Sequence, residues 1–483
     1  MMSFIKKLLR ISPAKHSALS SKKKVVKKLS RQSTLISREN HRISKANISQ
    51  NALKVLNRLH NEGYEACLVG GGVRDLLLGI APKDFDVATN ARPNEVSRLF
   101  RNSMLIGRRF RIVHVQFGRE IIEVTTFRAS EEHRENTEKS TSSPPQHHQR
   151  NAYGRKPATL ATVRLKDKSG MIIQDNIFGD ISQDAGRRDF TVNALYYNIA
   201  DSSVVDFTGG YQDLKDKMIR LIGNPDTRYQ EDPVRMLRAI RFSAKLNFTI
   251  EAQTAEPINR LAHLIKNVPS ARLSEEIFKV YHNGAAQQSH RLLCQYGLFE
   301  LFFPDTASLL GNEASENKLI QQALENTDTR FEQKKPVMPA FLLATMLWHP
   351  MLEESRLFQE EGDSPLEALE KAMSQVIHAQ NQAVAMPKRH WQVVREIWLL
   401  QYRFPRRAGP RPFRLLQHPR FRAAYDFLLI RALAGEESIE LADWWTTFQD
   451  ATHFEQDAMI KTVESLATAA TKKKKPRKKP KTL

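Results

Sequence analysis

Cysteine is scarce in this 483-residue sequence, which contains only Cys67 and Cys294. Two thiols so far apart cannot build a disulfide framework or, by themselves, a thiolate zinc site. The sequence also lacks any uninterrupted apolar run close to the about 20 residues that a membrane-spanning helix needs. We therefore expect no membrane association, and a reducing, cytoplasmic location agrees best with the few cysteines.

Acidic residues are nearly absent from both ends of the chain. Residues 1–45 contain 13 Lys and Arg but one acid, Glu39, and residues 472–483 contain eight Lys and Arg and no acid. We interpret residues 1–45 and 469–483 as basic disordered tails, and we expect a polyanionic partner such as nucleic acid. Solvated segments that only aid solubility are the alternative. A transit peptide is disfavoured because Lys rather than Arg dominates the N-terminal stretch.

The spacing of apolar residues predicts an α/β unit followed by an all-α region. Helical spacing and the bounding glycines indicate helices over 49–63, 73–79 and 93–100. Short apolar or alternating runs indicate strands over 64–69, 84–88, 110–117, 120–126 and 204–207. The polar stretch 129–157 is typical of a mobile loop, and its adjacent His147 and His148 lack the partners that a metal site needs. Beyond residue 213 the pattern is helical almost to the end.

Three consecutive glycines, Gly70 to Gly72, join a predicted strand to a predicted helix. Without side chains, the backbone N–H groups at such a helix start can approach a phosphate. The spacing matches neither GxxxxGK[ST] nor GxGxxG, so a simple tight turn is the alternative.

Two aspartates follow the glycines, with Asp84 and Asp86 on either side of Phe85. On a strand, residues two apart point to the same face, so both carboxylates would project together. Mg²⁺ is the natural partner of such a pair, because it takes one or two carboxylates together with substrate phosphates. A solvated pair in a turn is the alternative.

The order of several motifs resembles a known family. The segments GGGVRD, DFD, RRDFTVNAL, DFTGGYQDL and EDPVRMLRAIRF occur in this order between about residues 64 and 246. This sequence is similar to class II nucleotidyltransferases of the polymerase-β-like superfamily, which comprise bacterial poly(A) polymerases and CCA-adding enzymes. The resemblance implies an α/β polymerase-β-like nucleotidyltransferase head followed by an all-α neck, body and tail. The implied boundaries are 46–215 for the head, 216–285 for the neck and 286–468 for the body.

The resemblance also implies roles for individual residues in the head. Asp84 and Asp86 would bind the metal ions, and Gly70, Gly71, Arg74 and Asp75 would form the triphosphate loop. Superfamily architecture calls for a third carboxylate on a neighbouring strand, where Glu123 is suitably placed; an ordinary exposed strand residue is the alternative. In RRDFTVNAL, Asp189 would be an active-site residue, and Arg187 and Arg188 could bind phosphate or ribose oxygens. A surface cluster of ion pairs is the other reading of these three residues.

The EDPVR motif would recognise the nucleotide base. Asp232 and Arg235 lie three residues apart on a predicted helix opened by Pro233, so an acceptor and a planar donor would share one face with Glu231 nearby. Helix capping by the two acids is the alternative and is compatible with that role. We expect RNA contacts from arginines in the neck and in the basic segment 388–422: Arg228, Arg238, Arg241, Arg406, Arg407, Arg411 and Arg414. The aromatic residues within 391–422 are expected to be mostly core.

These observations predict a template-independent poly(A) polymerase that uses two Mg²⁺ ions, with Mn²⁺ as a possible substitute, and ATP as substrate. It would add AMP to RNA 3′ ends, release pyrophosphate and act in polyadenylation and turnover of RNA as a monomer. Arg228 just before the EDPVR motif resembles the poly(A) polymerase form of the neck. A CCA-adding tRNA nucleotidyltransferase and a non-catalytic RNA-binding protein with a decayed head are the alternatives.

Overall fold

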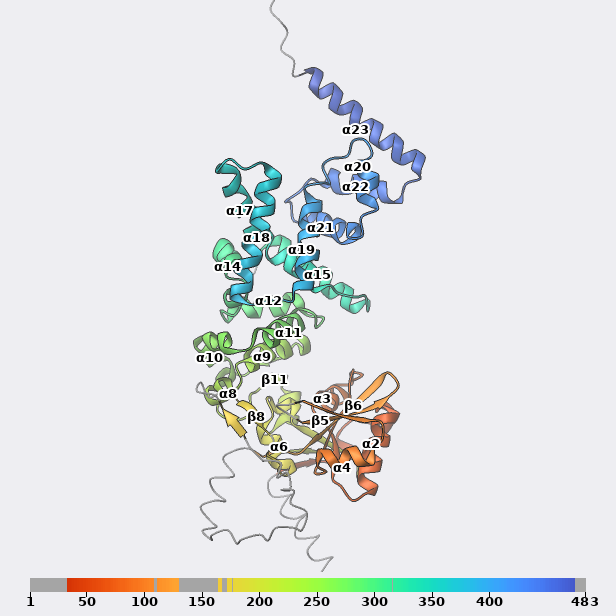
Figure 1. Cartoon of the computed structure of the whole chain (residues 1–483). Coiled ribbons are helices and arrows are strands. Elements are labelled where there is room, and N and C mark those ends of the chain that lie inside the picture. Colours follow the sequence, from red (N-terminus) through yellow and green to blue (C-terminus); the bar gives the residue numbers. More distant parts are fainter. Residues whose placement is uncertain are drawn as a thin grey trace, which may run out of the picture. The chain divides into compact units, whose positions relative to one another are not determined.

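The computed structural model describes residues 33–107, 111–129, 164–166, 172–175, 177–314 and 316–473 (Figure 1). The chain divides into two compact units. The first, which we call the head unit, runs to residue 235 and includes 248–257; the second, the helical unit, comprises 236–247 and the chain from 258 onward. Among the described residues, no helix is long and apolar enough to cross a membrane.

The head unit is built on an eight-stranded mixed sheet. In spatial order the strands are β1 (Thr34–Ile36), β10 (Ser203–Asp206), β9 (Leu195–Asn198), β2 (Ala66–Val69), β3 (Asp86–Thr89), β6 (Glu120–Thr126), β5 (Ile112–Phe117) and β4 (Ser103–Ile106). Within this sheet β3 and β6 pair in parallel, and the other neighbours are antiparallel. Smaller pairs join β7 (Arg164–Lys166) to β8 (Ile172–Asp175) and β11 (Met218–Ile219) to β12 (Thr249–Ile250).

In the described part of the head unit, six α-helices accompany these strands. They are α2 (Gln50–Asn61), α3 (Gly71–Leu78), α4 (Pro93–Leu99), α6 (Ile181–Arg187), α7 (Gly210–Lys215) and α8 (Pro225–Glu231). The Ser49 side chain caps α2 by accepting hydrogen bonds from the backbone N–H groups of Asn51 and Ala52. The face of α2 that carries Leu56 and Leu59 is buried, which confirms the amphipathic helix predicted there.

The boundary predicted for the N-terminal tail at residue 45 is wrong. Residues 34–36 form β1, which pairs with β10 in the main sheet, and Ile36 and Ile43 are buried. Nearby, the His41 ring nitrogen Nε2 lies 2.9 Å from the Ser202 carbonyl oxygen. The apolar side chains between the basic residues are enough to anchor this segment to the head. Residues 1–32 lie outside the described part of the chain, as do 130–157 of the predicted mobile loop, with His147 and His148.

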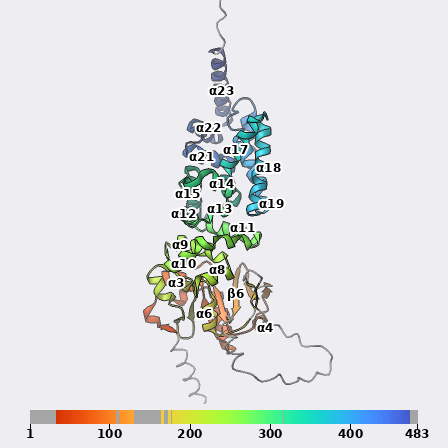
Figure 2. The same ribbon diagram turned by 90° about the vertical axis from the view of Figure 1, so that its left-hand side faces the viewer.

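The helical unit confirms the predicted change to an all-α chain (Figure 2). Helices α9 (Val234–Leu246) and α10 (Ala252–Leu261) begin in the head unit and continue into the helical unit. The remaining α-helices are α11 (Ser270–Tyr281), α12 (Ala286–Gln295), α13 (Phe299–Phe302), α14 (Pro304–Leu310), α15 (Lys318–Glu332), α16 (Pro339–Met346), α17 (Trp348–Glu360), α18 (Pro365–Ala383), α19 (Lys388–Gln401), α20 (Arg411–Leu416), α21 (Phe421–Leu433), α22 (Ile439–Asp450) and α23 (His453–Lys473).

Aromatic side chains fill the core of the C-terminal helices. Trp398 and Phe404 are fully buried, and Trp391 and Phe421 are nearly so, which confirms that these aromatics are mostly core. Trp398 Nε1 donates to the Ala344 carbonyl at 3.0 Å, so its one polar atom is paired inside the core. Among the arginines between these aromatics, Arg403, Arg406, Arg411 and Arg414 are exposed. The boundaries between head, neck and body remain predictions.

Candidate active site

The glycine turn brings three of the predicted site residues together. Gly70 has φ +75°, which L side chains rarely adopt, and it precedes α3 directly after β2. A Cβ placed there would lie 3.6 Å from Arg188 Nη1 and 3.8 Å from Asp86 Oδ2. A Cβ on Gly72 would lie 3.3 Å from the Asp84 carbonyl oxygen. The glycines therefore let the start of α3 pack against the segment that carries the two aspartates.

The sheet register aligns Asp86 with a second carboxylate. Asp86 on β3 pairs with Glu123 on β6, and Glu123 pairs with His114 on β5. Paired residues lie side by side on the same face of a sheet, so the three side chains form one row. Glu123 Oε1 lies 3.2 Å from His114 Nε2. Asp84 is exposed and precedes β3, whereas the strand had been predicted to begin at residue 84.

Like charges and burial act on Asp86. Burial, Glu123 and Asp84 together raise the pKa of Asp86 to about 6, although Arg188 opposes them. A carboxylate held in this way favours a nearby cation. The described residues nevertheless contain no group of three or more His, Cys, Asp or Glu side chains that could hold a metal. The ligand set of Asp84, Asp86 and Glu123 therefore stays a prediction. Asp84 and Asp86 suit Mg²⁺, which completes its shell with water and substrate phosphates.

A buried chain of hydrogen bonds links the glycine turn to Asp189. Arg74 is buried, and its Nε and Nη2 donate to Asp75 Oδ1 at 2.8 and 2.6 Å. Its Nη1 donates to Asn193 Oδ1 at 2.7 Å, and Asn193 Nδ2 donates to Asp189 Oδ1 at 3.2 Å. Arg74 and Asp75 therefore stabilise the glycine turn through buried hydrogen bonds. No site role was predicted for Asn193 from the sequence, although it lies inside the RRDFTVNAL motif.

A second buried acid, Asp184, was also missed. Its carboxylate is fully buried and forms ion pairs with Arg187 at 2.6 Å and Arg188 at 3.1 Å. It also accepts a hydrogen bond from the Tyr196 hydroxyl at 2.7 Å. Arg188 donates to that same hydroxyl at 3.0 Å. Asp184 thus holds the Arg188 guanidinium next to Asp86; Asp184 lies on helix α6, and Arg188 directly follows this helix.

Replacing Asp184 with asparagine should destabilise the protein by about 3–5 kcal/mol at neutral pH, because two arginines would lose their buried partner. Burial alone would raise the pKa of Asp184, but Arg187, Arg188 and the Tyr196 hydroxyl hold that pKa well below its ordinary value. A depressed pKa stabilises the fold above the unfolded pKa of about 4, and this contribution is lost as the pH falls further.

Urea unfolding of the wild type and the variant measures this difference. The gap in unfolding free energy should narrow as the pH is lowered below about 4. The same change at the exposed Asp216 is the control and should cost about 0.5 kcal/mol or less. Equal unfolding free energies for wild type and the Asp184 variant at pH 7 would contradict this role.

The EDPVR motif forms a corner between two helices, so Asp232 does not share a helix face with Arg235 as expected for a helix opened by Pro233. Helix α8 ends at Glu231, Asp232 is extended with φ −153° and ψ 94°, and α9 begins at Val234. Glu231 Oε2 accepts from Arg228 Nη1 at 2.8 Å and from Arg235 Nη1 at 3.2 Å. Arg235 Nη1 also donates to the Arg228 carbonyl at 2.6 Å, so ion pairs across the corner fix its shape.

Arg228 was predicted to contact RNA, and the structure contradicts this. The side chain is buried, and Nη2 donates to the carbonyls of Arg187 and Arg188, each at 2.6 Å. Arg228 therefore connects the EDPVR corner to the RRD motif. This connection places the predicted base-recognition and phosphate-binding segments in one bonded network.

The other predicted RNA-binding arginines lie in the helical unit. Arg238 and Arg241 both stack on Phe242, with 5.2 and 5.0 Å between the guanidinium carbon and the ring centroid. Arg406, Arg411 and Arg414 line one cavity of about 240 Å³ together with Arg403, which the sequence analysis did not single out. Arg407 is turned instead toward Trp444, 5.4 Å from its ring centroid, and burial lowers its pKa.

Comparisons with known proteins agree with this arrangement. Three family models match: "Poly A polymerase head domain" over residues 66–220, "Probable RNA and SrmB-binding site of polymerase A" over 247–310 and "Polymerase A arginine-rich C-terminus" over 361–481. Poly(A) polymerase I of Escherichia coli O6:H1 is 47% identical over 452 residues, which cover 92% of this chain and 92% of that protein.

Two more distant relatives are CCA-adding enzymes. That of Bacillus velezensis is 32% identical over 249 residues, which cover 52% of this chain and 54% of that protein. The crystal structure of the Bacillus stearothermophilus CCA-adding enzyme in complex with CTP matches with a TM-score of 0.53 and 23% identity, covering 82% of this chain and 81% of that one. This structural likeness shows a shared fold.

The head fold and the sequence relatives define a nucleotidyltransferase. Because the similarity to poly(A) polymerase I extends over nearly the whole of both proteins, the chain belongs to the bacterial poly(A) polymerase family.

Proposed function

We propose that this protein adds AMP from ATP to RNA 3′ ends without a template. The observation that carries the proposal is the 47% identity to a poly(A) polymerase over 92% of both chains, in a protein whose glycine turn lies next to Asp86 and Arg188. Extension of a labelled RNA with ATP as the single nucleotide tests this activity.

Asp84 and Asp86 would hold two divalent cations, Mg²⁺ in the first instance and Mn²⁺ as a substitute. When bound, such ions act as Lewis acids that stabilise the attacking and leaving oxygens of a phosphoryl transfer. Burial and the negative charges of Glu123 and Asp84 raise the pKa of Asp86, which supports this assignment, since a nearby cation stabilises the charged carboxylate. Glu123 stands in the same row and would orient Asp86 electrostatically, while its own carboxylate is bonded to His114.

The RNA 3′ hydroxyl oxygen would form a bond to the α-phosphorus of ATP, and the bond from that phosphorus to the bridging oxygen would break. Pyrophosphate leaves with that oxygen, and the hydroxyl proton passes to solvent water. The backbone N–H groups after Gly70 and Gly71 and the guanidinium of Arg188 would bind the phosphates. Asp189, held by Asn193, would accept a ribose hydroxyl. This is the arrangement that pre-organised catalysis of phosphoryl transfer requires.

The choice of ATP over CTP should depend on the EDPVR corner. We expect Asp232→Ala and Arg235→Ala to reduce the preference for ATP over CTP by about 1–3 kcal/mol, because base-edge hydrogen bonds would be lost. Steady-state kcat/KM with each nucleotide measures the preference, and RNA affinity should change less. Gln230→Ala, at an exposed position of the preceding helix α8, is the matched control. Full ATP preference in both variants would contradict base recognition at this corner.

RNA would be bound in part by the arginines of the helical unit. The exposed side chains of Arg403, Arg406, Arg411 and Arg414 around one cavity support a phosphate contact there, since guanidinium groups bind phosphate oxygens in a forked geometry. Arg238 and Arg241 are further proposed contacts. We also propose a monomer that acts in the cytoplasm, where the free thiols of Cys67 and Cys294 would stay reduced.

A further inference from the structure

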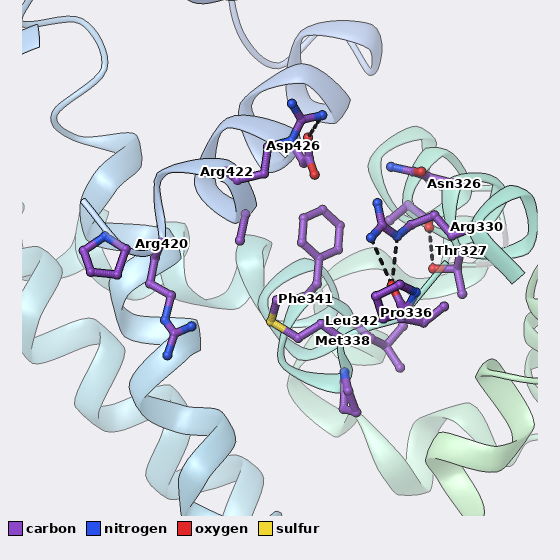
Figure 3. A pocket seen from close by; sticks show the side chains of 15 residues that line it. Asn326, Thr327, Arg330, Pro336, Met338, Phe341, Leu342, Arg420, Arg422 and Asp426 are labelled. Carbon is purple, nitrogen blue, oxygen red and sulfur yellow. Dashed lines mark hydrogen bonds and ion pairs between the residues drawn. The ribbon is translucent and has the colours of Figure 1, made fainter. Parts of the chain in front are cut away.

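The helical unit contains a cavity of about 430 Å³ that the proposed catalytic reaction does not use. Three segments enclose it: α15, the stretch from Pro336 into α16, and the start of α21 with the two residues before it (Figure 3). Its volume lies in the range of about 300–1,000 Å³ that is typical of ligand pockets.

An aromatic ring forms part of the lining of this cavity. Figure 3 shows the Phe341 ring between α15 on one side and the start of α21 on the other. An edge contact with the buried Phe427 holds the ring, with 5.9 Å between the centroids, while Phe341 itself stays partly exposed. Met338 and Leu342 extend the apolar surface beside it. A flat apolar group could therefore stack against Phe341.

Polar groups at the edge of the cavity are suited to the rim of a planar base. The side-chain amide of Asn326 has no hydrogen-bond partner among the described residues, and it projects from α15 at the cavity wall (Figure 3). An asparagine amide offers one acceptor and two donors, which match the N6 and N7 atoms of adenine in a bidentate pair. Beside it, Arg330 is fixed by Nε and Nη2 donating to the Pro336 carbonyl at 3.1 and 3.0 Å.

The charge of the lining favours an anion. Three arginines line the cavity against one carboxylate, Asp426. Arg422 pairs with Asp426 at 3.0 Å, and Arg420 pairs with Glu396 outside the lining at 3.0 Å. Both of these arginines are partnered through one nitrogen in these pairs, so each guanidinium retains donors for a phosphate oxygen. An apolar ring, an amide without a partner among the described residues and positive charge are together suited to bind the base and phosphate of a nucleotide.

We propose that this cavity binds an adenosine nucleotide of single-stranded RNA. The base would stack on Phe341 and pair with Asn326, and the flanking phosphates would meet Arg330 and Arg422. The proposal rests on the proposed function, because a poly(A) product supplies such nucleotides. A chain that adds AMP would thereby hold adenosine-rich RNA better than RNA of other sequence.

Binding of labelled A20 and U20 RNA to the full-length protein in EDTA, without ATP, tests this site. We expect Asn326→Ala to weaken A20 binding by roughly fivefold or more and to weaken U20 binding less, since the amide matches the N6 and N7 atoms of adenine in a bidentate pair. Phe341→Leu should weaken both RNAs by a similar factor, because stacking tolerates any base. Thr329→Ala, exposed on the same helix outside the cavity, is the control and should change neither affinity.

Photocrosslinking of A20 that carries 8-azidoadenosine locates the contact. We expect a crosslink to the tryptic peptide 335–356, which contains Phe341. Unchanged A20 affinity in both folded variants, or crosslinks only elsewhere, would overturn the proposal. Displacement of A20 from this peptide by free ATP would assign the cavity to mononucleotides. Displacement by a protein partner that leaves RNA bound elsewhere would assign the cavity to protein docking. Either outcome would contradict the proposal. Because no catalysis occurs in EDTA, these outcomes are independent of whether AMP addition takes place.

Discussion

Asp86→Asn should lower the rate of AMP addition by about 100-fold or more while RNA affinity stays within about twofold. Asp86 lies next to the glycine turn and Arg188, and burial together with the charges of Glu123 and Asp84 raises its pKa to about 6. The variant removes that charge but keeps the shape of the side chain, so the metal ions that stabilise the phosphoryl oxygens would be lost. Single-turnover rates at saturating RNA and ATP measure the effect.

Asp84→Asn should have a comparable effect on this rate, since one carboxylate cannot hold both ions. Asp201→Asn, which changes an acid of the same head unit outside the site, is the matched control and should retain the wild-type rate. Thermal unfolding must show that each variant is folded. Wild-type rates in either aspartate variant would refute the assignment of these two residues.

Deleting both basic ends should lower RNA affinity at low salt by orders of magnitude. Residues 1–32 contain ten Lys and Arg and no acid, and residues 474–483 contain six and no acid. Each phosphate contact on single-stranded RNA contributes a slope of about −0.7 to log K against log salt. If about six of these residues bind phosphates, deletion should flatten the slope by about 4. β1 stays in place in this truncation, because the sheet begins at Thr34.

The rate of AMP addition at saturating RNA should barely change in the truncated protein, because the aspartates, glycine turn and EDPVR corner are retained. Titration of a fluorescent RNA at several salt concentrations gives the slope for each protein. Should both proteins have the same affinity and slope, RNA binding would rest on the arginines of the helical unit instead.

Local patterns made much of this protein predictable. The Gly70 to Gly72 turn, helix α2 and the helical C-terminal region could be predicted because the spacing of glycines and apolar residues within short segments indicates them. Glu123 was expected on a strand next to that of Asp86, but the direct pairing of the two residues was not predicted, because strand register depends on partners distant in sequence.

Residues that act through distant partners were not predictable. Nothing near Asp184 in the sequence indicates its bond to Tyr196, and Arg228 was assigned to RNA because a buried arginine cannot be recognised from spacing. The α8–α9 corner did have a signal: Asp232 precedes Pro233, and a residue before proline disfavours the helical conformation. Strand β1 was not predicted, because it is only three residues long and lies in a segment rich in charged residues.

Extension of one labelled RNA by the purified protein, with Mg²⁺ and each nucleoside triphosphate supplied alone, tests the central claim most directly. Product length and nucleotide choice are read on a sequencing gel. The proposed function predicts long tails with ATP, none of comparable length with CTP, GTP or UTP, and no tails from Asp86→Asn. Addition that stops after a few nucleotides and requires CTP and a tRNA end, or no addition from any nucleotide, would contradict it.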